Sequence, residues 1–258
     1  MELDLAGKKA LITGGGRGIG RACALALAAE GAHVMICGRT QAALTSTLDE
    51  LGGEGSGHRS QAVDLASPDG PARLIQAVLE RFGEPDIVVQ NVGGTLDVRD
   101  PLAPVSDWQR VLRLNLEIGI ELTNAFIPHM QKRGSGRMIF LSSLAAFEQQ
   151  GSLAYGVAKA AVTAYARGIG RLYAADGIVV SAIVPGVVLT EGGTWDTNRQ
   201  RDPEGIARYV EEKLPRRRFG SPEEIADAVV FLASSRASAF SGSLVPMDGG
   251  QGAGTFGQ

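Results

Sequence analysis

The chain has 258 residues, of which 44% are hydrophobic and 21% charged, and its formal net charge is −3. A chain of this length fits one large α/β domain or two small ones, and it can bury a core without disulfides or metals. The small negative charge gives no electrostatic reason to expect nucleic acid or an anionic membrane as a partner. The two cysteines and three histidines are scattered, so we expect no metal site and a reducing compartment.

The start of the chain, Met1-Glu2-Leu3-Asp4, is polar and acidic, and a strand is expected by about Lys8. No apolar run approaches the ~18 residues of a membrane span. We therefore expect a cytoplasmic protein without a signal peptide. The tail from Gly249 contains five glycines in its last ten residues, which favours a mobile terminus over a packed element.

Short apolar runs rich in Val and Ile alternate with helical stretches, as expected for strands buried on both faces of a parallel sheet. Apolar residues recur with a helical period from Ile19 to Leu27, and Gly31 supplies a stop. This rhythm predicts right-handed crossovers and a doubly wound parallel sheet with helices on both faces, in a single domain spanning residues 1–258. The predicted strands are Lys9–Thr13, Ala32–Cys37, Gln61–Leu65, Asp86–Asn91, Met138–Ser142, Ile178–Val184 and Ser243–Met247.

One long interruption runs from Glu191 to about Pro215, before the last helix and strand. In an open α/β sheet, long insertions at the carboxyl ends of strands tend to cover the ligand. We therefore expect a substrate lid at about 190–215.

A glycine-rich stretch, Thr13-Gly14-Gly15-Gly16-Arg17-Gly18-Ile19-Gly20, joins the first strand to the first helix. Glycines let the backbone turn sharply there and approach a pyrophosphate, whose charge then lies at the helix N-terminus. Such stretches are common in strand–helix turns, but this position after a buried strand favours a dinucleotide.

The residues after the second strand indicate which dinucleotide binds. An NAD enzyme places a carboxylate there, about twenty residues past the glycine loop, where it holds the ribose hydroxyls. Here the strand is followed by Gly38 and Arg39, and Arg17 offers a second cation from the glycine loop. The missing acid and the two guanidinium groups predict NADP(H) as the cofactor.

Tyr155 and Lys159 are four residues apart in a helical stretch, so both project from one face. An ammonium near a phenol lowers the phenol's pKa and brings it closer to neutral pH, where it can act as an acid or base. Such pairs are also common on helices without any catalytic role.

Together these elements resemble the short-chain dehydrogenase/reductase family along essentially the full length. The matching residues are Thr13–Gly20, Asp64, Asn91-Val92-Gly93, Asn115, Ser142-Ser143, Tyr155, Lys159, Pro185-Gly186 and Thr190. The resemblance implies a Rossmann-type seven-stranded sheet and an oxidoreductase that interconverts a ketone and a secondary alcohol. It also implies a homotetramer, built by the helices around Ala154–Ala166 and Leu112–Leu122.

The resemblance also implies the role of each residue. Tyr155 would exchange a proton with the substrate oxygen, Lys159 would lower the pKa of Tyr155 and hold the nicotinamide ribose, and a serine would bind the substrate oxygen. Asn115 would anchor a water that supplies protons to Lys159. The expected cofactor-binding residues are Gly14, Gly16, Arg17, Gly18, Ile19, Gly20, Arg39, Thr40, Asp64, Leu65, Asn91, Gly93, Tyr155, Lys159, Pro185, Val188 and Thr190.

The sequence departs from the family's pattern in places. Gln90 and Ser181 stand where asparagine is common, and we expect only small effects from them. The usual spacing before Tyr155 selects Ser142 as the catalytic serine, whereas counting forward from Asn115 selects Ser143. Strands resist insertions more than loops do, so we favour Ser143 with a loop one residue short.

The substrate is the least determined feature. The runs Phe219–Ile225 and Asp248–Gly250 resemble those of 3-oxoacyl carrier-protein reductases. In those enzymes two arginines dock the acidic carrier protein. Lys132 or Arg133 matches the first of these arginines, but Asp176 occupies the position of the second. The polar run Glu148–Gln150 favours a small polar or acidic ketone over an acyl thioester. Trp195, Arg199 and Arg201 in the lid can supply a stacking face and a carboxylate clamp, or can equally be solvated loop residues. A non-catalytic cofactor-binding regulator is the alternative of another class. Candidate substrate contacts are Ser142, Gln149, Gln150 and Trp195.

Overall fold

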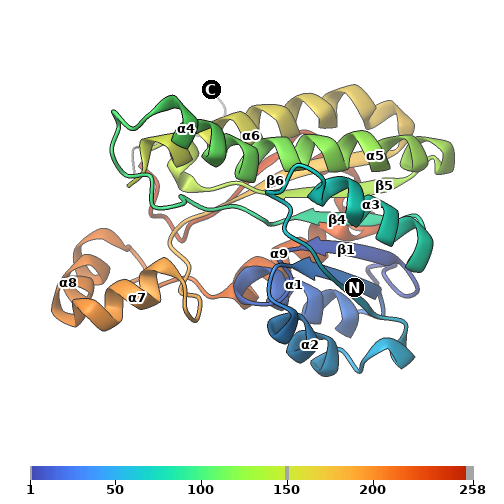
Figure 1. Cartoon of the computed structure of the whole chain (residues 1–258), viewed down its shortest axis with the longest axis horizontal. Helices are drawn as coiled ribbons and strands as arrows, with labels where there is room; N and C mark the ends of the chain where they lie inside the picture. The colour runs from blue at the N-terminus through green and yellow to red at the C-terminus, as the bar shows by residue number, and fades with distance from the viewer. Residues whose placement is uncertain (1, 149–150, 254–258) are drawn as a thin grey trace.

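The computed structural model describes residues 2–148 and 151–253. The strands form one parallel seven-stranded sheet in the order β3-β2-β1-β4-β5-β6-β7, with helices on both faces (Figure 1). This confirms the predicted fold class. The strands are β1 (Lys9–Thr13), β2 (His33–Gly38), β3 (Arg59–Ala62), β4 (Ile87–Gln90), β5 (Gly136–Leu141), β6 (Ile178–Pro185) and β7 (Leu244–Met247).

β3 departs most from its predicted range, because the strand lies two to three residues earlier than Gln61–Leu65. Val63 and Leu65 are buried although they follow the strand, with exposed fractions of 4% and 3%. Val63 still donates its N–H to the Gly38 carbonyl, at 2.8 Å, as the chain leaves the ladder. Buried residues outside a strand give the same apolar pattern as residues within it, so the prediction placed the strand too late in the chain.

Helices connect the strands and enclose the sheet. Shorter helical turns lie at Glu54–Ser56, Leu144–Ala146, Ala174–Asp176 and Ser235–Phe240, and a π-helical turn lies at Arg113–Glu117. The helices are α1 (Gly18–Ala29), α2 (Gln41–Glu50), α3 (Gly70–Arg81), α4 (Val105–Leu112), α5 (Ile118–Arg133), α6 (Leu153–Tyr173), α7 (Thr194–Arg201), α8 (Pro203–Lys213) and α9 (Pro222–Ala233).

The alternation of side chains along β1 divides the core into two layers. Ala10 and Ile12 join a buried cluster with residues of α1 and α9, whereas Leu11 joins the opposite cluster with residues of α3, α5 and α6. Because successive strand residues point to opposite faces, every central strand is apolar on both sides. The sheet thus forms the frame of the protein, and the loops that follow the strands gather at the carboxyl ends of those strands.

The first helix ends where the sequence predicts. Gly31 has a left-handed φ of 82° and donates its N–H to Ala28 at 2.9 Å, while Ala32 donates to Leu27 at 3.1 Å. These two bonds satisfy the last free carbonyls of the helix and reverse the chain into β2.

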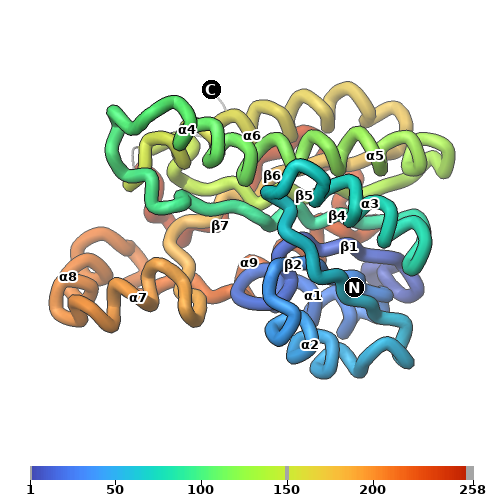
Figure 2. The backbone as a smooth tube through the Cα atoms, viewed as in Figure 1, coloured from blue at the N-terminus to red at the C-terminus, as the bar shows by residue number. Residues whose placement is uncertain are grey.

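The segment predicted as a lid contains α7 and α8, which project from the body as a separate arm (Figures 1 and 2). A parallel bridge between Val188 and Gly220 closes the base of this arm. Within it, the Trp195 ring packs on Tyr209 with centroids 4.8 Å apart and on Phe219 at 5.7 Å. The arm therefore has a small aromatic core of its own.

The start of the C-terminal tail is packed, which corrects the expectation of a mobile terminus for residues 249–253. Asp248 accepts N–H groups of Gly250 and Gly252 at 3.0 and 2.9 Å. Gly249 and Gly250 both have left-handed φ values, of 61° and 82°, which glycine adopts without a steric penalty. The two glycines and the aspartate thus form a tight turn that folds the tail back onto the body.

Within residues 2–148 and 151–253, no helix combines the length and the hydrophobicity needed to cross a bilayer.

Candidate active site

The two halves of the sheet meet between β1 and β4, where the chain order reverses. A crevice forms at such a switch point, outside the carboxyl ends of the strands. Here Thr13, at the end of β1, accepts the N–H groups of Asn91 and Val92 at its hydroxyl, at 3.0 and 3.1 Å. The Asn91 side-chain amide donates to the Thr13 carbonyl at 2.9 Å. These bonds fix the glycine loop to the end of β4.

The glycine loop then turns the chain into α1. Gly14 and Gly18 have left-handed φ values of 68° and 54°. The N-terminus of α1 carries no capping side chain and no acidic residue in its first turn, so its free N–H groups favour an anion. A Cβ on Gly18 would lie 3.2 Å from Thr190 Cγ2. The segment after β6 thus lies against the loop, as expected for Thr190.

The predicted adenosine end lies at the ends of β2 and β3. Arg17 and Arg39 are exposed, as is Thr40, and neither arginine forms an ion pair with any residue in the described part of the chain. Asp64 accepts the N–H of Ala66 at 3.0 Å and so caps the turn after β3. The two guanidinium groups remain available to a phosphate, and they fit the phosphorylated ribose of NADP(H).

Tyr155 lies in the first turn of α6. Ser152 caps this helix by accepting the Tyr155 N–H at 3.2 Å, and its own hydroxyl donates to the Val98 carbonyl at 2.5 Å. The tyrosine ring packs on a small apolar cluster that includes Val98 and Ala154. Ser152 was missed from the sequence, although a serine three residues before Tyr155 is a common helix N-cap.

Lys159 lies one turn further along α6 and is 3% exposed. Its Nζ donates to the Leu141 carbonyl at 2.7 Å and lies 5.5 Å from the centroid of the Tyr155 ring. Burial lowers the pKa of Lys159 to about 8, because desolvation disfavours the charged form. At pH 7 the amine is therefore still mostly protonated.

The expected lowering of the Tyr155 pKa does not occur in this arrangement. Burial raises the pKa of the phenol, and a hydrogen bond with Ser143 lowers it by less. The Lys159 ammonium lies over the ring and bonds to a backbone carbonyl, and desolvation, which disfavours the charged phenolate, is the largest influence on the pKa of Tyr155. At neutral pH Tyr155 therefore keeps its proton.

The two serines point in opposite directions, as neighbouring residues at a strand end do. Ser142 is buried, and its hydroxyl lies 2.7 Å from that of Thr163 and 3.2 Å from the Lys159 carbonyl. Ser143 follows β5, accepts the Ala145 N–H at 3.2 Å and hydrogen-bonds Tyr155. Ser142 therefore joins the sheet to α6, and Ser143 is the serine that faces the tyrosine.

Asn115 lies in the π-helical turn Arg113–Glu117 between α4 and α5. Its Nδ2 donates to the Val111 and Gly94 carbonyls, both at 2.8 Å, and its Oδ1 accepts the Gly94 N–H at 3.0 Å. Single π-helical turns are frequent at functional sites. Asn115 thus clamps the loop after β4.

Gln90 replaces the usual asparagine and bonds to the first turns of α5, which follows the π-helical turn. It is 7% exposed, and its Nε2 donates to the Gly119 carbonyl and the Thr123 hydroxyl, both at 3.2 Å. The longer side chain therefore finds partners one helical turn beyond Asn115.

Gly93 is where these groups meet. A Cβ there would lie 2.6 Å from Asn115 Oδ1 and 2.9 Å from Lys159 Nζ, so only glycine lets these two side chains come this close to the loop after β4. The uncapped N-terminus of α1, with no acidic residue in its first turn, fits the pyrophosphate of a dinucleotide. Pro185 ends β6, and Val188 pairs with Gly220 at the base of the lid.

The lid residues behave differently from the expectation. Trp195 is occupied by its contacts with Tyr209 and Phe219, and Arg199 donates to Asp196 at 2.9 Å. A carboxylate clamp formed by Arg199 is therefore not assembled. Gln149 and Gln150 lie outside the described residues.

Comparison with known proteins identifies the family. The family model described as enoyl-(acyl carrier protein) reductase matches residues 14–251. A 3-oxoacyl-[acyl-carrier-protein] reductase of Escherichia coli is 34% identical over 253 residues, which cover 96% of this chain and 98% of that protein. The chain is a short-chain dehydrogenase/reductase.

Solved members of this family share the architecture closely. L-sorbose reductase of Gluconobacter frateurii, determined with NADPH and L-sorbose, has 32% identity and a TM-score of 0.91, with 99% of this chain and 100% of that chain covered. A 3-oxoacyl (acyl-carrier-protein) reductase of Agrobacterium tumefaciens with NADP bound has 30% identity and a TM-score of 0.88, with 95% of each chain covered. The chain is thus an oxidoreductase of this family.

Proposed function

We propose that the protein is an NADP(H)-dependent ketoreductase that interconverts a small polar ketone and the corresponding secondary alcohol. The observation that carries the proposal is the convergence of Ser143, Tyr155 and Lys159 beside Gly93, at the carboxyl ends of β4 and β5. A proton donor, a hydroxyl that can bind an oxygen and a buried cation meet there.

When bound, NADPH supplies the hydride that reduces the carbonyl carbon. Ser143 donates a hydrogen bond to the carbonyl oxygen and holds it near Tyr155. Tyr155 transfers its proton to that oxygen as negative charge develops there, and the Lys159 ammonium stabilises the phenolate that remains. Asn115 holds the loop at Gly94 and, as a proposal, a water that returns a proton through Lys159.

The test of this function is reduction of ketones followed by NADPH absorbance, with polar ketones, keto acids and acyl thioesters as substrates. A non-catalytic regulator would bind NADPH and turn over none of them. An enzyme of this family with another chemistry, such as epimerisation, would convert substrate without net loss of NADPH.

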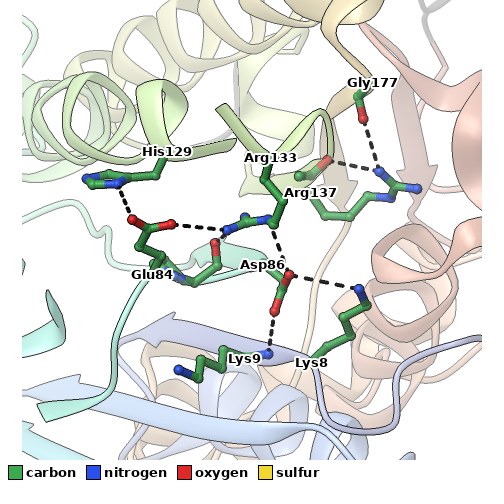
Figure 3. Close-up of polar contacts among 10 residues, drawn as sticks. Lys8, Lys9, Glu84, Asp86, His129, Arg133, Arg137 and Gly177 are labelled. Atoms are coloured by element: carbon green, nitrogen blue, oxygen red, sulfur yellow. Dashed lines mark hydrogen bonds and ion pairs between the residues drawn. The ribbon is translucent and has the colours of Figure 1, made fainter. Parts of the chain in front are cut away.

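Acyl thioester reduction with a carrier protein is the second candidate, and one surface argues against it. Arg133 donates to the Pro85 carbonyl at 2.9 Å and lies 3.6 Å from Glu84 and 3.5 Å from Asp86 (Figure 3). Asp176, where a docking arginine would be needed, accepts a bond from Gln131 at 2.8 Å. Arg133 is internally paired and Asp176 is an acid, so of these docking positions only the exposed Lys132 offers positive charge to an acidic carrier.

The two serines give a direct test of the catalytic assignment. Ser143→Ala should lower kcat by about 10- to 100-fold, since it removes one hydrogen bond to the substrate oxygen on which negative charge develops. Ser142→Ala should leave kcat within about threefold and lower thermal stability, because it leaves the buried Thr163 hydroxyl with one partner fewer. Steady-state kinetics and melting curves measure both. The opposite ranking would assign catalysis to Ser142.

We also propose that the protein assembles as a homotetramer through α5 and α6. The outer side of α6 exposes Val157, Ala160, Ala164 and Leu172, a surface that allows close approach of another helix. Light scattering should give about four times the monomer mass of 26.9 kDa, and Ala164→Arg should give a smaller species. A mass equal to the monomer for the wild type would rule out the assembly.

A further inference from the structure

The described part of the tail packs against the residues that follow Ser143 and β6. A Cβ on Gly186 would lie 2.7 Å from Gln251 Oε1 and 2.9 Å from Asp248 Cα, so the tail rests on the segment that follows β6. On its other side, a Cβ on Gly252 would lie 2.9 Å from Leu144 Cδ1. Leu144 follows Ser143 in the chain. The segment 248–253 therefore bridges the ends of β5 and β6, which flank the reacting groups.

Gln251 joins this segment to the lid. Its Oε1 accepts the N–H of Val187 at 2.9 Å, and its Nε2 donates to the Tyr209 hydroxyl at 3.2 Å. Tyr209 belongs to α8 and packs on Trp195. One side chain thus links the strand end, the tail and the aromatic core of the arm.

The surface formed in this way is rich in hydrogen-bonding groups and weakly acidic. Glu148 and Asp248 carry negative charge there, whereas Arg216 and Arg218, which line the same pocket as Asp248 and Gln251, share the Glu224 carboxylate. The Glu148 carboxylate accepts the Ala253 N–H at 2.6 Å, and the Asp248 carboxylate accepts two tail N–H groups. Carboxylates accept hydrogen bonds from hydroxyl groups and repel a carboxylate or phosphate brought near them. An uncharged substrate with several hydroxyl groups suits this surface better than a keto acid or a long apolar acyl chain.

We propose that residues 248–253 form one wall of the substrate site, that Gln251 is the positioning residue of this wall, and that the wall selects short, uncharged, polyhydroxylated ketones. This inference rests on the ketoreductase function proposed above and names its substrate class. It assigns Trp195 to the support of the wall through Tyr209.

The experiment compares NADPH-dependent reduction of L-sorbose, acetoacetate, acetoacetyl-CoA and 2-butanone. Gln251→Leu keeps the side chain's approximate size and removes the hydrogen bonds to Val187 and Tyr209, so the KM for L-sorbose should rise about tenfold with kcat within about twofold. The KM for 2-butanone, which has no hydroxyl group to bind, and the Kd for NADPH should not change. Gln251→Glu retains the acceptor for Val187 and should recover part of the loss.

Two further variants separate positioning from general damage. Tyr209→Phe removes only the hydroxyl that Gln251 reaches, and its effect should not add to that of Gln251→Leu, because both break one link. It also tests the link if the leucine variant fails to fold. Gln76→Leu makes the same change on α3, where Gln76 bonds to Glu80, and should leave every constant unchanged. Glu148→Gln should raise kcat/KM for acetoacetate relative to L-sorbose.

The outcomes distinguish the two levels of the proposal. If the wild type reduces none of the four compounds with NADPH, the proposed function itself is contradicted. If it reduces a ketone, but Gln251→Leu and Tyr209→Phe leave all KM values unchanged, the function stands and the wall is wrong. A wild type that prefers acetoacetyl-CoA over L-sorbose would also overturn the selection.

Discussion

Tyr155→Phe is expected to lower turnover by about two to four orders of magnitude, the usual contribution of general acid catalysis. Burial raises the pKa of the phenol, so the wild-type side chain carries its proton at neutral pH and can deliver it as the carbonyl is reduced. Phenylalanine retains the ring, which packs on the cluster around Val98, and loses only the hydroxyl. Turnover measured with the best ketone of the substrate screen tests this.

The control for this variant is the affinity for NADPH, which fluorescence titration should show to be nearly unchanged. A melting temperature close to that of the wild type would show that the ring packing survives. A variant that keeps more than about a tenth of wild-type turnover would contradict general acid catalysis by Tyr155.

The second large effect concerns the choice of cofactor. The wild type should prefer NADPH over NADH by about tenfold or more in kcat/KM, because each bond from Arg17 or Arg39 to the extra phosphate contributes about 1.5–3 kcal/mol. The double variant Gly38→Asp with Arg39→Leu should reverse this order. A Cβ on Gly38 would lie 3.6 Å from Leu44 Cδ2, an ordinary contact distance, so the aspartate fits and can hold the ribose hydroxyls.

A matched control is Arg73→Leu, which makes the same change at an exposed arginine on α3 whose partner is Asp69. It should leave the cofactor preference unchanged. Equal use of both cofactors by the wild type would show that the two arginines do not set the preference.

The sheet and the pairing of Tyr155 with Lys159 could be predicted from the sequence because both follow from short-range patterns. β1 has the predicted bounds, and Tyr155 and Lys159 do share one face of α6. The Ser142/Ser143 alternative needed the structure, because one residue of register decides which hydroxyl faces Tyr155. The sign of the Tyr155 pKa shift also needed it, since sequence spacing gives proximity to Lys159 but not burial.

Other features had no local signal. The π-helical turn at Asn115 depends on how α4 and α5 pack, and nothing in the residues around it marks the extra residue in that turn. Gln251 lies in a glycine-rich stretch whose composition indicates mobility, yet its partners Val187 and Tyr209 are far away in sequence. Contacts of this range become visible only in three dimensions.

Asp86 and its partners (Figure 3) lie at the amino ends of β1 and β4, whereas Ser143 and the glycine loop follow the carboxyl ends of the strands. Asp86 accepts the N–H of Lys9 at 2.9 Å and lies 3.5 Å from the Arg133 guanidinium, so it fastens two strands and the end of α5 together. The bonds that hold the frame are thus separated by the full length of the strands from the loops that we propose hold the substrate. Variation of the loops at one end leaves the anchoring at the other end intact. A library of variants that keeps the buried Leu144, the turn formed by Asp248, Gly249 and Gly250, and Gln251, and that varies the other residues of 144–148 and 248–253, can therefore explore new ketones at a smaller cost to folding.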